Sequence, residues 1–269
     1  MVVPRWQLRH RLAALVLLAP LLAACSDEPT PTPTPTPTST STSTPTPDLR
    51  TDGVIRILFL GNSHTSRNDV PGTVEALWRS ADPGVEVEAV LGPGSLHLDD
   101  RGDDQATLEA IASQPWDFVV LQAQNYSLSG CCDYPTTSAE KLVRLARAQG
   151  ATPVLYAEWA RRGIDETGLI LRTYGRIATH EPACLPPVPE SFRIAHQRDP
   201  GVVLLSEDGN HAAPTGSFLA SAVLTTAMSG RPAAAMGDLD AVDVSPELQQ
   251  ELRAVADEAM TRLPGDRAC

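Results

Sequence analysis

Residues 55–65 read IRILFLGNSHT, a short run of large apolar side chains that ends abruptly in a polar turn. An apolar run of this length, stopped by Gly61 and Asn62, predicts a buried strand that ends in a turn. Ligands of open α/β sheets bind at the carboxyl ends of the strands, so Ser63 stands where a nucleophile would be placed. A serine there can equally cap the helix that follows.

The first fifty residues have a different character. An arginine-containing start, an apolar run at 12–22 and two alanines are typical of a secretory signal peptide, predicted over residues 1–24. The run is too short for a good transmembrane span. Residues 22–25, LAAC, resemble a bacterial lipobox, which implies cleavage before Cys25 and its lipidation. Ordinary secretion with an incidental cysteine is the alternative.

Residues 25–50 consist mainly of alternating Thr-Pro and Ser-Thr. Such a tract cannot bury apolar surface, and its prolines favour an extended chain. We expect a disordered linker that holds the folded part away from a membrane. Residues 51–265 are then long enough for one α/β domain.

The chain has 269 residues, a formal net charge of −12 and a single lysine, Lys141. Binding to nucleic-acid phosphates requires clustered Lys and Arg, so this composition argues against a nucleic-acid partner. An exported protein can keep disulfides, and four cysteines remain besides Cys25: Cys131, Cys132, Cys184 and Cys269. Adjacent cysteines rarely pair, so we expect Cys131 and Cys132 each to reach Cys184 or Cys269. Free thiols are the alternative, and no Cys-x-x-Cys or His-x-x-x-His supports a metal site.

Five apolar runs, at 54–60, 85–91, 118–122, 152–156 and 202–205, predict strands that are covered on both faces. Helix-like stretches separate or follow them at 74–80, 104–112, 138–149, 164–179, 214–228 and 246–262. Alternating strands and helices predict a three-layer α/β/α sandwich of flavodoxin-like type, with a mostly parallel five-stranded sheet.

Polar residues follow several of these strands. The second strand leads into GPGSL, where Gly94 would let backbone N–H groups approach a ligand, although a plain turn also uses glycine. The third leads into QAQN, residues 122–125, whose amides could donate hydrogen bonds to an oxyanion. The fifth leads into DGNH, residues 208–211. Asp208 and His211 share a face if this segment is a helical turn, so Asp208 could orient His211 toward Ser63.

These blocks resemble the SGNH, or GDSL-like, hydrolase superfamily from about residue 54 to residue 228. The resemblance implies a catalytic domain at 51–265 in which Ser63 is the nucleophile, His211 the base and Asp208 its partner. It implies an oxyanion site built from the N–H groups of Ser63 and Gly94 and the Gln122 amide. No metal or cofactor is implied.

Two blocks depart from the family pattern. The first has Asn62 where Asp is common, and the third lacks Gly-x-Asn-Asp. The third resembles the Gln-containing block of carbohydrate acetylesterases, which favours Gln122, but a slip of two or three residues would select Gln124 or Asn125.

Other residues near the predicted site are weaker candidates. Asn62, His64 and Trp159 could contact substrate, although Trp159 could equally pack in the core. Tyr156 and Glu158 end the fourth strand at the same edge of the sheet. We read residues 184–190, which are rich in proline, as a rigid loop.

The resulting hypothesis is a lipid-anchored serine esterase outside the cytoplasm, acting on acetyl or other short-chain O-acyl esters, including those of carbohydrates. A non-catalytic glycan- or envelope-binding lipoprotein on the same fold and an acyltransferase are the alternatives. The sequence does not indicate an oligomeric state.

Overall fold

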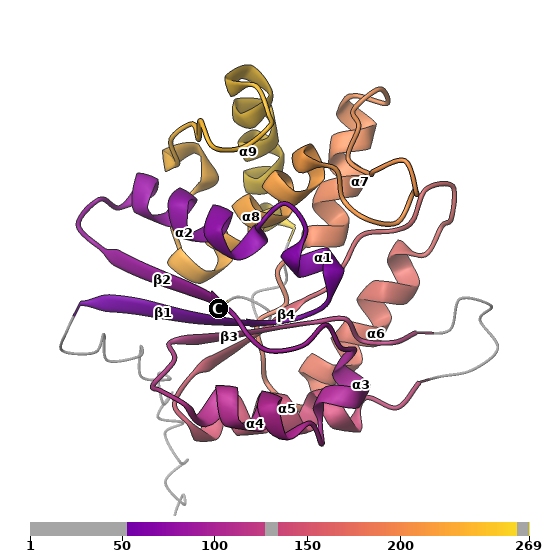
Figure 1. Cartoon of the computed structure of the whole chain (residues 1–269). Coiled ribbons are helices and arrows are strands. Elements are labelled where there is room, and N and C mark those ends of the chain that lie inside the picture. The colour runs from indigo at the N-terminus through magenta and orange to yellow at the C-terminus, as the bar shows by residue number, and fades with distance from the viewer. Residues whose placement is uncertain (1–52, 127–133, 263–268) are drawn as a thin grey trace, which may run out of the picture. The chain divides into compact units, whose positions relative to one another are not determined.

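The computed structural model describes residues 53–126, 134–262 and 269 (Figure 1). The predicted signal peptide, the linker, Cys25, Cys131 and Cys132 lie outside these residues. None of the helices in the described residues is long and apolar enough to cross a membrane.

Four parallel strands form the sheet in the described residues. They are β1 (Val54–Leu60), β2 (Glu86–Leu91), β3 (Phe118–Gln122) and β4 (Thr152–Tyr156), in the order β2-β1-β3-β4. The register pairs Leu60 with Leu121 and Gln122 with Tyr156. Because all four strands are parallel, their carboxyl ends lie on the same side of the sheet. The turn after β1 and the segments after β3 and β4 therefore lie together there, at the carboxyl-end edge.

Helices cover both faces of this sheet, as the sequence predicts (Figure 1). The side chains of β1 alternate between the faces: Ile57 and Phe59 join one core cluster, and Leu58 and Leu60 join the other. Long helices with apolar faces complete the clusters. On the first side lie α2 (Val70–Ala81), α7 (Val188–Arg198), α8 (Pro214–Ser229) and α9 (Pro246–Thr261), and on the second α4 (Gln105–Ala112), α5 (Thr137–Ala148) and α6 (Thr167–His180).

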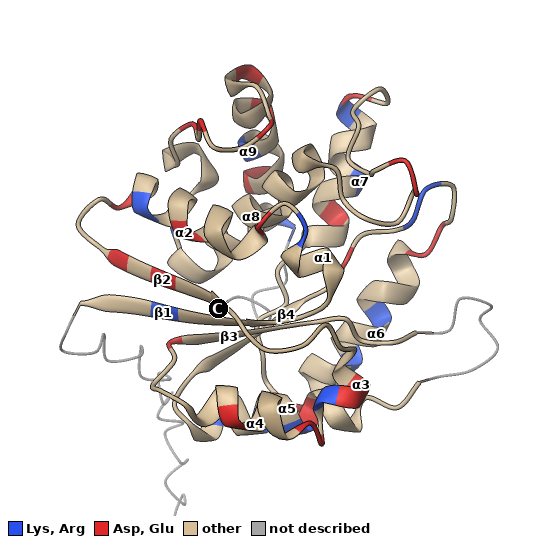
Figure 2. Cartoon of the chain, in the orientation of Figure 1, with Lys and Arg blue, Asp and Glu red and all other residues tan. Residues whose placement is uncertain are grey.

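Local sequence sets several helix starts. Asp104 and Ser245 cap α4 and α9 with their side-chain oxygens, and a proline follows the cap of α2, α8 and α9. Short helical turns α1 (Ser63–Ser66), α3 (Leu98–Arg101) and η1 (Ala233–Ala235) complete the described elements. Charged residues lie mainly in the helices and loops (Figure 2). The edge strand β2 carries two exposed glutamates, Glu86 and Glu88.

The prediction of a fifth strand at 202–205 is wrong. Val203 is exposed, and Leu205 forms only an isolated antiparallel bridge with Ala212. The sheet edge beside β4 is instead occupied by Cys184, which exchanges backbone hydrogen bonds with Leu155 (2.8 Å) and Pro153 (3.0 Å). The neighbouring prolines have no N–H group, so this ladder cannot be extended.

The segment 184–190 is also not a loop throughout, because α7 begins at Val188. Proline is tolerated in the first turn of a helix, where its missing N–H has no intrahelical partner. Pro189 therefore lies in the first turn of α7, where the proline-rich sequence suggested only a rigid loop.

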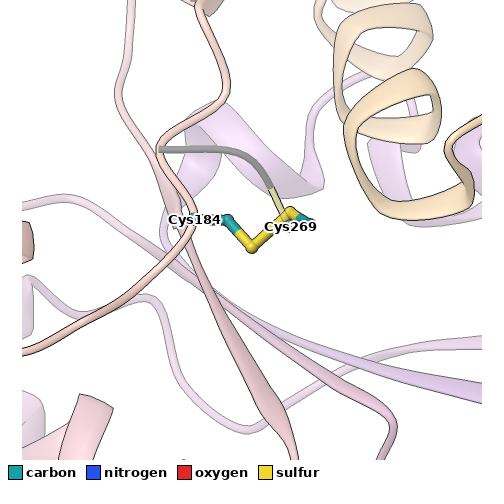
Figure 3. The surroundings of a disulfide bond; sticks show 2 residues. All are labelled: Cys184 and Cys269. Carbon is teal, nitrogen blue, oxygen red and sulfur yellow. A yellow bond between two sulfur atoms is a disulfide. The ribbon is translucent and has the colours of Figure 1, made fainter. Parts of the chain in front are cut away.

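The expected disulfide pairing is wrong as well. Cys184 bonds to Cys269, the last residue of the chain, with their Cα atoms 4.9 Å apart (Figure 3). Neither is therefore left to pair with Cys131 or Cys132. The bond connects the chain end to the segment that extends the sheet beside β4, which no cysteine spacing in the sequence could reveal.

We expect a Cys269→Ser variant to lose about 4 kcal/mol of unfolding free energy, because 85 residues of separation are no longer bridged in the unfolded chain. Denaturant unfolding without reductant measures the loss, and a variant with both Cys184 and Cys269 replaced should lose no more. A peptide map of the unreduced protein that joins Cys184 to Cys131 or Cys132 would contradict the pairing.

Candidate active site

The turn after β1 presents Ser63 at the start of α1. Asn62, not Ser63, caps this helical turn: its side-chain oxygen accepts from the N–H of His64 at 3.0 Å. The Ser63 hydroxyl is thus not used as a cap. It lies 2.8 Å from Nε2 of His211, on the segment that precedes α8.

Asp208 completes a hydrogen-bonded row. Its Oδ2 lies 2.6 Å from Nδ1 of His211, and its Oδ1 accepts from the N–H groups of Asn210 and His211, both at 2.9 Å. The backbone donor at Asn210 and the His211 ring hold the pKa of the Asp208 carboxyl well below its ordinary value. The carboxylate therefore both closes an Asx turn and binds the imidazole.

Residues 206–211 form a tight loop closed by the Ser206 N–H on the His211 carbonyl (2.8 Å), not the helical turn predicted. Three side chains from other segments hold this loop. The Arg162 guanidinium donates to the carbonyls of residues 205, 206 and 207, Trp159 Nε1 donates to Asn210 O (2.9 Å), and Asn68 donates to Ala212 O (3.1 Å).

The sequence left two positions open for Trp159, against a substrate or in the core, and the structure shows the second. Its side chain is buried and stacks on Phe192, with ring centroids 4.7 Å apart, so it packs the core beneath the loop and is not open to a substrate. An open cavity of about 500 Å³ has Asp208 in its lining, together with Arg161, Arg162, Ile164 and the loop residues Glu207, Gly209 and Asn210.

His64 lies between Trp159 and His211, with ring centroids 5.3 Å and 4.9 Å away. Burial, with the nearby His211, lowers the pKa of His64 to about 4, so its ring is neutral at neutral pH. Its Nδ1 lies 3.8 Å from Oε1 of Glu158, and burial raises the pKa of that carboxyl to about 7. As the pH rises, His64 becomes neutral near pH 4, whereas Glu158 becomes negatively charged only near pH 7. The two side chains are therefore not charged together and do not form an ion pair.

Gln122, the predicted oxyanion donor, lies beneath the turn and is buried. Its Oε1 accepts from the Asn62 N–H (2.8 Å) and the Thr65 hydroxyl (2.7 Å), and its Nε2 donates to Glu158 Oε1 (2.5 Å). Both ends of the amide are therefore used inside the protein. The structure does not bring this amide to Ser63 as an oxyanion donor.

The side-chain amides of the alternatives Gln124 and Asn125 also donate to other groups of the protein. The backbone turns at Ala123, whose φ is +81°, and both amides then donate to the carboxylate of Asp99, at 3.0 and 2.7 Å. Within the described residues, neither the N–H of Ser63 nor that of Gly94 has a hydrogen-bond partner. The two backbone donors that the sequence suggested therefore remain free, whereas the three amides are engaged.

Arg101 is a buried residue of this region that sequence reasoning missed. Its guanidinium donates to the carbonyls of Gly61 (2.6 Å), Pro93 (2.9 Å) and Gly94 (3.0 Å), so it ties the turn after β1 to the loop after β2. The sequence around Arg101 gives no sign of this role, because an arginine that follows two aspartates is typical of a solvated surface.

Adding a methyl group at Gly61 tests the close packing of the turn. A Cβ there would overlap Thr65 Oγ1 and Gln122 Oε1, so we expect Gly61→Ala to lower the free energy of unfolding by roughly 1–3 kcal/mol. Gly175→Ala is the control, because a Cβ meets nothing within 4 Å there. Equal stability of both variants in denaturant unfolding would contradict this account.

The raised pKa of Glu158 predicts a pH-dependent stability. The folded state binds the Glu158 proton more tightly than the unfolded chain does. The contribution of this proton to the free energy of unfolding is therefore complete below pH 4.5 and is lost as the pH rises through about 7. Glu158→Gln lacks the titration, and we expect its free energy of unfolding relative to the parent protein to rise by about 3 kcal/mol across this range. Urea unfolding of both proteins at matched pH measures the difference, and a constant difference would contradict the prediction.

No protein-family model and no curated protein matches the chain, but solved structures do. A candidate SGNH hydrolase from Slackia heliotrinireducens is 29% identical; the match covers 65% of this chain and 99% of that one, with a TM-score of 0.51. A DUF4886 family protein from Bacteroides uniformis ATCC 8492 is 17% identical, with 77% and 95% covered and a TM-score of 0.60. A candidate GDSL-like lipase from Parabacteroides merdae ATCC 43184 is 12% identical, with 65% and 95% covered and a TM-score of 0.51.

These similarities confirm the architecture that the blocks around Ser63 and His211 predict. They agree with a parallel sheet between two helical layers, in which the turn after β1 and the loop before α8 lie at the same edge (Figure 1). The described part of the chain has the fold of the SGNH, or GDSL-like, hydrolases.

Proposed function

We propose that this protein is a serine esterase that cleaves O-acyl esters through Ser63, His211 and Asp208. The observation that carries the proposal is the unbroken row from Ser63 Oγ through the His211 ring to Asp208, with contacts of 2.8 and 2.6 Å. The similarity to a candidate SGNH hydrolase, at 29% identity, supports the same reaction class.

The first half of the reaction forms an acyl-enzyme. Ser63 Oγ attacks the ester carbonyl carbon while its proton passes to Nε2 of His211, and Asp208 stabilises the imidazolium that forms. When the tetrahedral intermediate collapses, the bond to the alcohol oxygen breaks, and the imidazolium returns the proton to that oxygen. The alcohol leaves and the acyl group remains on Ser63.

The second half repeats these steps with water. His211 accepts a proton from water as the oxygen attacks the acyl carbon, and then returns it to Ser63 Oγ as the carboxylic acid leaves. In both halves the negative oxygen needs hydrogen-bond donors, and the N–H groups of Ser63 and Gly94 are the candidates. Loss of one such donor typically raises the barrier by about 3 kcal/mol.

The substrate belongs to the finer part of the proposal. We favour acetyl or another short acyl group, on a carbohydrate or a small alcohol, with Asn62 and His64 at the margin of the site. Half-burial of Asn62 and the small exposed fraction of the His64 side chain, 13%, are compatible with one edge of each meeting a substrate.

The cellular setting is also proposed. The apolar run at 12–22, the LAAC segment and the Thr/Pro-rich tract support export, lipidation at Cys25 and attachment to the cell envelope through a spacer. Such an enzyme would act on esters outside the cytoplasm.

Replacing the proposed nucleophile and base tests the function. We expect Ser63→Ala and His211→Ala to lower kcat/KM for p-nitrophenyl acetate by at least about 1,000-fold, because each removes a group that acts on the reacting atoms. Ser66→Ala, an exposed serine of the same helical turn, and His196→Ala, on α7, are matched controls.

A fluorophosphonate probe gives a second readout. The adduct should map to Ser63 in the parent protein and be absent from His211→Ala. Full activity in both variants, or no adduct at Ser63, would contradict the proposal and favour a non-catalytic binding protein. Products formed with a sugar acceptor present distinguish acyl transfer from hydrolysis.

A further inference from the structure

Glu158 is a buried carboxyl group to which the proposed reaction assigns no step. It follows β4 by two residues, and it accepts hydrogen bonds from Gln122 Nε2 at 2.5 Å and from the Tyr174 hydroxyl of α6 at 3.3 Å. The Tyr174 oxygen in turn accepts from the N–H of Gln124, at 3.0 Å. The carboxyl group is thus enclosed by donors from two other elements.

The direction of the Gln122 amide is fixed by its partners. A backbone N–H can only donate, so the atom facing Asn62 must be the oxygen, and the NH₂ group must face Glu158. That NH₂ group is buried and requires an acceptor, which Glu158 supplies. Without one, the amide would either leave a donor unpaired or rotate and lose the bond to Asn62.

Placing a carboxyl group in this buried space costs free energy. Burial disfavours its charged form, and an apolar residue of similar size would avoid that cost. The neighbouring buried carboxylate of Glu166 is matched by Arg161, which donates to both of its oxygens at 2.8–2.9 Å. Glu158 has no such cation among its hydrogen-bond partners; the Gln122 amide and Tyr174 take that place.

We propose that Glu158 is the positioning residue for the nucleophile: it fixes the Gln122 amide, and the amide fixes the turn that presents Ser63. The inference rests on the proposed role of Ser63 as the nucleophile. A single oxygen, Gln122 Oε1, binds the residue before Ser63 and the residue two after it. Ser63 lies between these two anchors, so a shift of the amide moves its hydroxyl relative to His211.

Small displacements of a nucleophile are costly for the reaction. A misplacement of about 1 Å lowers rates by as much as about 100-fold, while groups that contact the rest of the substrate are unaffected. Loss of Glu158 therefore lowers kcat and leaves KM nearly unchanged. A residue that only stabilises the fold would lower the amount of folded protein and leave kcat per folded molecule intact.

The test compares Glu158→Leu, Glu158→Asp and Glu158→Gln with Glu166→Leu as the matched control. Expected is a fall in kcat of about 10- to 100-fold for Glu158→Leu with KM within about threefold, and a smaller fall for Glu158→Asp, whose carboxylate is displaced by a methylene. Glu158→Gln keeps an acceptor for Gln122 and restores kcat to within a few-fold. Glu166→Leu removes an equally buried carboxylate outside this chain of hydrogen bonds and leaves kcat per folded molecule unchanged.

A double variant shows whether Glu158 acts through Gln122. If it does, Glu158→Leu combined with Gln122→Leu has no lower kcat than the worse single variant, because both break the same connection. Multiplied losses in the double variant would overturn the inference, as would an unchanged kcat in folded Glu158→Leu and Glu158→Asp.

Hydrogen exchange of the Asn62 amide separates this inference from the proposed function. Its protection should fall in Glu158→Leu and Glu158→Asp and stay at the parent level in Glu158→Gln and Glu166→Leu, whether or not the protein cleaves esters. Parent-level protection in folded Glu158→Leu or Glu158→Asp would overturn the positioning role. A parent protein that is neither active nor labelled at Ser63 overturns the esterase proposal alone.

Discussion

The hydrogen bonds around the Gln122 side chain are the constraint on which the rest of the site depends. A strand that ends in a tight turn leaves backbone groups without partners, and burial makes each unpaired group costly. Gln122 supplies the acceptor for this turn from the neighbouring strand, and Gly61 is required because a larger residue would occupy the space of that amide. The same atoms that satisfy the backbone thus set the position of Ser63.

Two imidazoles lie side by side at this edge, in different surroundings. His211 binds a carboxylate whose pKa is lowered, and it contacts the serine, whereas His64 is held between aromatic rings with its pKa reduced to about 4. A neutral neighbour places no second positive charge beside an imidazolium on His211. His64 therefore fills the space next to His211 without competing for the Asp208 carboxylate and without repelling the positive charge that His211 carries as an imidazolium.

Much of the fold could be predicted because β1, β3 and β4 are near-continuous apolar runs bounded by turns, and their limits agree with the sequence. Residues 202–205 have the same composition, but the edge that they would join is already bonded to Cys184, a tertiary fact with no local signal. The motifs likewise predicted that Ser63, Asp208 and His211 lie together, and hydrogen bonds join them in the structure. The directions of the amides after β3 could not be read from the sequence, because they depend on what lies beneath the turn and on the backbone at Ala123.

The Cys184–Cys269 bond closes a covalent ring from residue 184 to residue 269, and only some residues of the site lie within that ring. Asp208 and His211 lie inside the ring that the bond closes, together with α7, α8 and α9, whereas Ser63, Gln122 and Glu158 lie outside it. Cleavage of one peptide bond within the ring leaves both fragments attached. At the cell envelope, where we propose that the protein is located, a nick in a loop of this part would not release the segment that carries the imidazole.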